Sequence, residues 1–422
     1  MNTNGFSAEI GRAGGGVINV VTKSGAEHLS RQCLRVLPRP RAERQHLHQQ
    51  VAWNRAPALP LQPVRRHGGR THQKDKICFF LSYDGQRNLN PNPVFFNFTV
   101  PSDAQSQAGA AELAKYLTPY TTGYRNNIGL AKVDWNLSNT QRLSVRLNIH
   151  RFTGINFENG GSQSAQEHTG NSLVSTNSLA VNYSKVFGSA VVFDSRFNWV
   201  KDDEPGEANS TAPETVVNQS GGSFTFGRNN FSPRYTNSKR YQFIESVSYL
   251  RGKHAYKIGG DLNFERIDNF FPGNFYGRLP LQQPGGLRRP AAIVQFTQGF
   301  AGAGTDGPLT KPNIKEFALF VQDAWRVTDR LTLNYGYRYD IASYAQPSVL
   351  NPDAGLAAQG LATNRINTDT NNHAPRFGFA YRLRREGPAT AARRLRDLLL
   401  PHALHPHRYG DVPTGSRCRP TR

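Results

Sequence analysis

The stretch that decides the fold is LFVQDAWRVTDRLTLNYGYRYD, residues 319–340. After its central turn the sequence alternates strictly between two kinds of residue. Every second position carries Leu331, Leu333 and then three tyrosines, and the positions between them include Arg338 and Asp340. Successive side chains of a β-strand point to opposite faces, so this pattern predicts a strand with one apolar face and one charged face. A dry protein core would have to pair each buried charge, and the charged face therefore requires water.

Similar runs recur in pairs along residues 74–381. Short turns join the two members of each pair, for example at residues 138–141, 188–189, 251–253 and 328–329, and long polar loops separate one pair from the next. Bacterial outer-membrane barrels combine strands of at least ~9–11 residues with short turns on one side and long loops on the other. We therefore predict an all-β fold, an antiparallel transmembrane β-barrel fragment of about ten long strands in a curved open sheet, with no helix interrupting the series.

The two parities of these strands predict two environments. An apolar parity with aromatic residues near the strand ends favours lipid and its boundary with water, whereas a charged parity favours a wet lumen. The side chains that we expect to face lipid or form the aromatic girdle are Trp135, Leu143, Val145, Leu147, Trp199, Tyr256, Ile258, Leu262, Phe264, Trp325, Leu333, Tyr335, Tyr337 and Tyr339. Those that we expect to face the lumen are Arg146, Asn148, Lys257, Asp261, Asn263, Asn334 and Arg338.

The net charge of +21 would ordinarily point to nucleic acid, but its distribution argues otherwise. Residues 30–73 hold nine Arg and one acid, and residues 382–422 hold ten Arg and three acids. Both segments contain no Lys and show neither helix nor strand periodicity. We expect them to be irregular, out-of-frame translations; basic arms that bind nucleic acid or an acidic surface are the alternative. Without them the basic excess largely disappears, so we expect no nucleic-acid partner.

The amino-terminal stretch FSAEIGRAGGGVINVVTKSG, residues 6–25, resembles the end of the plug domain of TonB-dependent outer-membrane receptors. The Oar-like branch is the most similar, and residues 74–88, 320–340 and 372–381 resemble it in the same order. The resemblance implies the cell outer membrane, contact with its lipid, the TonB complex as partner and energy-driven uptake of a bulky ligand. Which ligand this is cannot be read from the sequence. It also implies a tight plug turn at Gly14, Gly15 and Gly16.

On this basis we divide the chain into four segments. Residues 1–29 are expected to be the end of the plug domain, and residues 74–383 a partial outer-membrane barrel. Residues 30–73 and 384–422 are the two anomalous basic segments, where the resemblance also fails. The opening residues show no charged and apolar signal-peptide pattern, and no region to contact TonB is recognised, so we expect the chain not to transport anything alone.

Other chemistries leave weak patterns in this sequence. The amino-terminal glycines do not have the spacing of a phosphate loop, because Thr22 precedes Lys23. The three cysteines and the scattered histidines lack metal-site or disulfide spacing. We therefore expect no enzyme, no cofactor and no metal. A soluble or secreted β-rich binding protein and a basic nucleic-acid-binding chain stay open as alternatives, which a detergent requirement and a salt-dependent DNA mobility shift would separate.

Overall fold

The computed structural model describes residues 7–11, 22, 30–35, 64–73, 76–281 and 295–382, with the backbone alone described in 30–35 and 64–73. Within these residues the chain forms one antiparallel sheet of 13 strands in the order β1-β2-β3-β4-β5-β6-β7-β10-β11-β14-β15-β16, with β13 paired to β11. Neighbours in the sheet are neighbours in the sequence apart from two long excursions. The predicted all-β antiparallel fold is confirmed.

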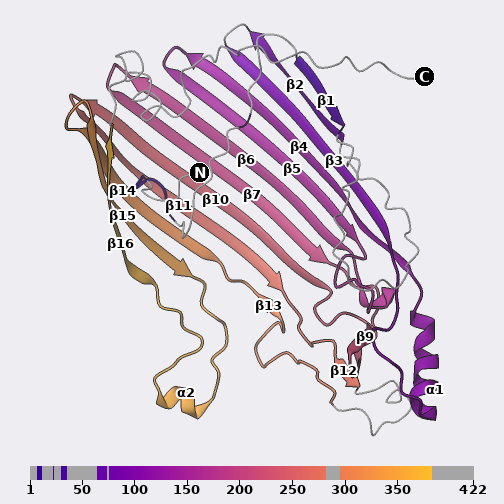
Figure 1. Cartoon of the computed structure of the whole chain (residues 1–422). Coiled ribbons are helices and arrows are strands. Elements are labelled where there is room, and N and C mark those ends of the chain that lie inside the picture. The colour runs from indigo at the N-terminus through magenta and orange to yellow at the C-terminus, as the bar shows by residue number, and fades with distance from the viewer. Residues whose placement is uncertain are drawn as a thin grey trace, which may run out of the picture.

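Figure 1 shows a curved sheet whose strands run obliquely, with the helices and short extra strands gathered at one end. The strands of the sheet are β1 (Ser30–Arg35), β2 (Val64–Gln73), β3 (Ile77–Asn92), β4 (Tyr120–Ser138), β5 (Gln141–Ile155), β6 (Ser172–Phe187), β7 (Val191–Gly206), β10 (Arg234–Arg251), β11 (His254–Phe270), β13 (Leu309–Thr310), β14 (Ile314–Arg326), β15 (Leu331–Tyr344) and β16 (Asp369–Tyr381). No pairing between β1 and β16 closes the described part of the sheet.

Tight turns connect the strand pairs where the sequence predicts them. Gly188 follows β6 and Gly252 follows β10, and both have φ of 58°, a left-handed conformation that glycine adopts at little cost. Asn139 and Thr140 alone separate β4 from β5. The opposite ends of these strands are joined by long connections, so the sheet has a tight-turn end and a long-connection end.

The long connections pack together into a small cap. Strands β8 (Glu214–Gln219), β9 (Gly222–Phe226) and β12 (Arg278–Leu281) form a second sheet in the order β12-β8-β9, in which β12 and β8 are parallel. Val217, Phe224 and Leu281 are buried against Leu113 at the end of helix α1 (Ala104–Leu113), and this apolar cluster is the main dry core of the described residues. The cap ties four long connections to the sheet.

Three expectations are corrected by the structure. Helix α1, with the 3₁₀ turn η1 (Ala114–Tyr116), lies between β3 and β4, and η2 (Gln166–His168) and α2 (Ala354–Ala358) lie in other connections, although no helix was expected. Neither α1 nor α2 is long and apolar enough to cross a membrane.

The sheet also has more than the expected ten strands, because β1 and β2 lie inside segment 30–73, which was expected to be irregular. Backbone hydrogen bonds alone can extend a sheet. Strand β2 pairs with the edge of β3 from Val64 to Gln73 through the backbone, so this pairing does not depend on the side chains of β2. Residues 36–63 and 383–422 lie outside the described residues.

Candidate functional site: a polar seat on the inner face

The inner face of the sheet is defined here as the face against which residues 7–11 lie. Lys257 on β11, Gln322 on β14, Gly336 on β15 and Arg376 on β16 pair directly from strand to strand, so they form one row across this face. Each belongs to the polar parity of its strand. The row lies close to the tight-turn end, since Lys257 is only the fourth residue of β11.

Residues 7–11 form a turn that is bonded to this row. The Ser7 hydroxyl donates to Gln322 Oε1 at 2.6 Å and the Ala8 amide donates to the same oxygen at 2.8 Å. Arg376 Nη1 donates to the Ser7 carbonyl at 2.6 Å. The contacts use backbone groups as well as side chains, so they fix the path of the segment and not just one residue. We call the inner-face row of Lys257, Gln322, Gly336 and Arg376 the seat.

Glu9 supplies the ionic contacts of the segment. Its Oε1 is 2.8 Å from Arg196 Nη1 on β7, and its other oxygen, Oε2, accepts a hydrogen bond from Lys257 Nζ. Burial by itself would raise the pKa of Glu9, but the charges of Lys257 and Arg196 outweigh it and hold that pKa below its ordinary value. A single carboxylate therefore joins the segment to two strands.

Arg338 lies beneath the segment and is completely buried. Its guanidinium donates to both carboxylate oxygens of Asp340, at 2.8–3.0 Å, and lies 3.5 Å from Asp261 Oδ2. A further N–H reaches the Glu9 carbonyl at 3.2 Å. Two acids neutralise this buried cation, which leaves one of its donors for the backbone of the segment.

Two glycines permit the close approach of the segment to the sheet. A Cβ at Gly11 would come within 2.4 Å of the Arg338 guanidinium, and a Cβ at Gly336 would come within 3.0 Å of the Ala8 side chain. The first distance is shorter than real Cβ contacts and the second is tight, so larger residues at either position would push the segment away from the seat.

The predicted lumen-facing residues divide into two groups. Lys257, Asp261 and Arg338 come together at the seat, whereas Asn263 donates to Glu316 at 2.7 Å farther along β11. Asn148 on β5 donates to Ser178, Arg146 lies on the same strand, and Asn334 is exposed. Sequence reasoning missed Glu9, Arg196, Gln322 and Arg376, because nothing in the sequence shows which residues a distant segment will meet. Gly14, Gly15 and Gly16 lie outside the described residues.

The predicted lipid-facing set lies on the opposite, outer face of the sheet. Ile258 is 60% exposed and Tyr335 is 43% exposed, although both are large and apolar or aromatic. Six members of the set are half-buried: Leu143, Val145, Trp199, Trp325, Leu333 and Tyr339. Acids interrupt this face, among them Glu245 on β10, which accepts a hydrogen bond from the Ser195 hydroxyl at 2.7 Å, and Asp323 on β14, which accepts one from the Tyr335 hydroxyl at 2.6 Å. A lipid-facing role for this face stays a prediction.

The cap contains a buried polar cluster around Glu214. Arg278 Nε donates to its Oε1 at 2.7 Å, and the Asn230 amide donates to its Oε2 at 3.1 Å. The ring of His168 lies 4.0 Å from the same carboxylate and 3.3 Å from the Gly227 carbonyl. Burial lowers the pKa of His168 below its ordinary value.

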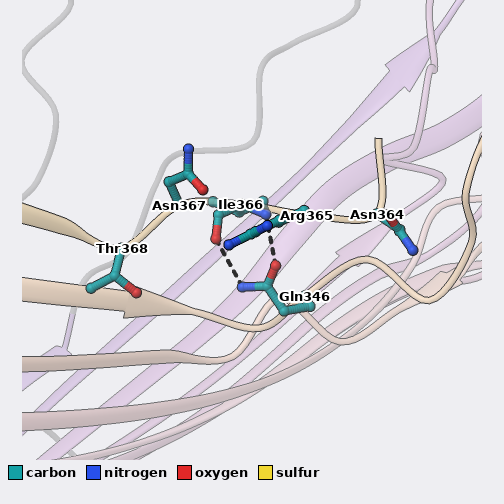
Figure 2. Close-up of a pocket in the computed structure, with 6 residues that line it drawn as sticks. All are labelled: Gln346, Asn364, Arg365, Ile366, Asn367 and Thr368. Atoms are coloured by element: carbon teal, nitrogen blue, oxygen red, sulfur yellow. Dashed lines mark hydrogen bonds between the residues drawn. The ribbon is translucent and has the colours of Figure 1, made fainter. Parts of the chain in front are cut away.

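A shallow pocket lies at the long-connection end between β15 and β16. It is lined by Gln346 and residues 364–368, and Figure 2 shows the Gln346 side chain bonded to the backbone of Ile366 on both its nitrogen and its oxygen, at 3.0 and 2.7 Å. The amide of Gln346 is thereby occupied in holding the loop. Arg365 is the one charged residue among those that line the pocket.

Comparison with known sequences fits this architecture. Residues 106–393 match the sequence model of the family described as an outer membrane β-barrel domain, a span of more than half the chain. The chain belongs to this family. It is a cell outer-membrane protein, and the predicted location is confirmed.

The resemblance to TonB-dependent receptors is confirmed as well. The barrel is 27% identical over 165 residues to the TonB-dependent transporter Oar of Myxococcus xanthus, a match that covers 34% of this chain and 14% of Oar. Two solved structures share its fold with a TM-score of 0.50: a mutant of the ferric enterobactin receptor PfeA from Pseudomonas aeruginosa and the siderophore receptor PirA from Acinetobacter baumannii. They are 12% and 11% identical to it, and each match covers 88% of this chain and 44% or 43% of the receptor.

Proposed function

We propose that this barrel is part of a TonB-dependent receptor-like transporter, in which residues 7–11 are the end of the plug and the seat is where that end docks on the barrel wall. The observation that carries the proposal is the pair of ion pairs from Glu9 to β7 and β11, which join residues far apart in the sequence. A plug inside a barrel requires such polar contacts with the lumen wall, because the wall is wet and charged.

The activity that follows is the family's energy-driven uptake of a bulky ligand across the outer membrane. The TonB complex is the proposed energy source, and the class of ligand is left open. The chain spans under half of the receptors that it matches, and the described sheet has two edges. Unpaired strand edges cannot lie in hydrocarbon, so we propose that the chain supplies part of a wall and does not transport alone.

A cross-linking experiment tests the docking. The full chain is expressed with an added signal peptide and fractionated, and its membrane insertion is followed by a heat-modifiable gel shift. The variant with Ser7→Cys and Gln322→Cys should be cross-linked readily by a short reagent with two thiol-reactive groups, because the Ser7 hydroxyl lies 2.6 Å from Gln322 Oε1 at the end of that longer side chain. The control variant pairs Ser7→Cys with Asn148→Cys on the distant β5 and should not.

Four outcomes would contradict the proposal. Equal cross-linking yields in the two variants would show that residues 7–11 do not dock on the seat. A folded, heat-modifiable species that conducts ions would favour a small pore formed by the chain itself. A chain that folds without detergent would favour the soluble β-rich binding protein, and a salt-dependent DNA mobility shift would favour the nucleic-acid-binding alternative.

A further inference from the structure

The outer face carries a band of basic side chains that the seat does not use. It consists of Arg87 on β3, Arg125 on β4, Arg151 on β5, Lys201 on β7, Lys239 on β10 and Arg266 on β11, and we call it the outer basic band. All six belong to the parity of their strand that faces away from residues 7–11. Five are exposed, and the Lys201 side chain is 38% exposed.

The band lies at a constant height above the tight turns. Arg87, Arg151 and Lys201 are each ten residues from the tight-turn end of their strand, and the other three are 12 or 13 residues from it. With a rise of ~3.3 Å per residue and a tilt of about 40°, these spacings correspond to about 25–33 Å. The apolar band of an outer-membrane barrel is about 25 Å tall. The cations therefore lie just beyond it, toward the long-connection end.

Aromatic side chains lie directly below part of this band. Trp199, Tyr241 and Phe264 pair with one another across β7, β10 and β11, each two residues nearer the tight turns than a basic residue. Tyr241 is 36% exposed and Phe264 is 40% exposed. Aromatic rings of this kind favour the boundary between hydrocarbon and headgroups, so the row above them falls at headgroup level.

Like charges face each other across neighbouring strands of the band. Lys201 pairs directly with Lys239, and Lys239 pairs directly with Arg266. Arg87 likewise pairs with Arg125. Like charges in direct cross-strand pairs destabilise a sheet. An anion bound between two paired cations would replace this repulsion by a net attraction.

The acids on this face leave most of the band uncompensated. Asp203 forms an ion pair with Lys201 at 2.7 Å, and Asp268 lies on the outer face of β11. Among the described residues neither Lys239 nor Arg266 forms an ion pair. These two cations are therefore available to bind a ligand from outside.

Two guanidinium groups of the band are held flat against the sheet in the same way. Arg87 donates to Asn127 Oδ1 at 2.7 Å and to two backbone carbonyls, and Arg151 donates to Asn177 Oδ1 at 2.9 Å and to two backbone carbonyls. Each pair of residues lies on adjacent strands. The repeated arrangement orients these cations in advance, and a guanidinium that stays in place suits phosphate recognition.

We propose that the outer basic band binds the phosphate groups of anionic lipid headgroups in the membrane leaflet at the long-connection end. Each cation near an anionic surface strengthens membrane binding about fivefold. The aromatic row sets the depth of the barrel in the membrane, and the outer basic band supplies the positive charge that binds the headgroups. The inference rests on membrane insertion, which family membership gives, and is independent of transport.

Quenching of Trp199 fluorescence tests this binding, because Trp199 lies beside Lys201. The full chain, with its other three tryptophans replaced by Phe, is folded in mixed micelles of detergent and phosphatidylcholine that contain brominated phosphatidylglycerol or brominated phosphatidylcholine. We expect stronger quenching by the anionic lipid at the same mole fraction. The variant with Lys239→Gln and Arg266→Gln should lose about 30-fold in the preference for anionic lipid.

A matched variant separates the band from net charge. Arg240→Gln with Arg146→Gln removes the same two charges from the inner face, and it should leave the preference unchanged. The swap Lys239→Arg with Arg266→Lys should preserve it. Equal quenching by both lipids, or equal losses in the inner and outer variants, would overturn the proposal. If the outer double variant does not fold, Lys239→Gln against Arg240→Gln gives the same comparison at about fivefold.

Discussion

Replacing Glu9 by Gln should release residues 7–11 from the seat. The change removes the charge from both contacts and leaves a single acceptor oxygen, so either Arg196 or Lys257 then faces the NH₂ group of the amide. A hydrogen bond to a charged group is worth about 1.5–3 kcal/mol and a neutral one about 0.5–1.5 kcal/mol, so each contact loses about 1 kcal/mol. Arg196 is one-third exposed, and solvent screening limits its share. The two contacts together give about 2 kcal/mol, or about a 30-fold shift toward the released segment.

Hydrogen exchange of the Ala8 amide measures this shift, because that amide is bonded to Gln322 in the docked state. In Glu9→Gln its protection should fall about 30-fold, since exchange follows the local opening equilibrium. Glu265→Gln is the matched control, because it makes the same charge change on the inner face of β11 without contact to the segment. Equal protection in Glu9→Gln and Glu265→Gln would refute the ionic seat.

The pH dependence of the same amide follows from the lowered pKa of Glu9. A carboxylate whose pKa is depressed in the docked state contributes stability above its ordinary pKa of 4.5 and loses it as the pH falls through the lowered value. Protection of Ala8 should therefore fall in acid below about pH 4.5 in the parent chain. It should become flat with pH in Glu9→Gln. A parent chain with no loss of protection in acid would contradict this assignment.

Three further predictions concern the seat and the cap. Gly11→Val should undock residues 7–11 by steric conflict with Arg338, measured as loss of the cross-link between cysteines at positions 7 and 322, whereas a normal yield would show that the segment bends around the added atoms. Phe224→Ala should destabilise the cap by about 3–5 kcal/mol because the ring is fully buried, with fast exchange in the cap and unchanged exchange in the sheet strands. Because the pKa of His168 is lowered by burial, the cap should lose stability as the pH falls below about 6.5, and His168→Gln should flatten that dependence in a pH series of cap exchange.

The parts of the fold that repeat locally could be predicted from the sequence. In β11 the residues from Tyr256 to Glu265 alternate between exposed and sheltered positions along the strand, as their hydrophobicity indicates. The tight turns are likewise local, since Gly188 and Gly252 adopt the conformation that such turns require. Helix α1 could also have been found, because Asp103 accepts hydrogen bonds from the Gln105 and Ser106 amides as a helix cap, ahead of an alanine-rich run.

The remaining parts depend on contacts between distant segments. Strand β2 is rich in Arg and lacks alternation, and it is extended because the edge of β3 offers free backbone groups. The seat depends on where residue 9 meets strands nearly 190 or more residues away, which no local periodicity encodes. Glu9, ahead of Gly11, and Gly336, a glycine on the charged side of β15, are visible in the sequence. Their roles become clear only in the fold, where residues 7–11 lie next to β15.

The positions of the basic residues, and not their number, determine which anionic groups they bind. On the inner face several bases have close acidic partners: Lys132 lies 2.9 Å from Asp134, and Lys257 contacts Glu9. On the outer face Lys239 and Arg266 face each other and no acid pairs with either of them within the described residues. Pairing of charges within the protein stabilises a wet lumen, whereas unpaired cations above an aromatic row favour an external anion. The proposed contact with the membrane surface thus rests on the six cations of the outer basic band, and not on the net charge of the chain.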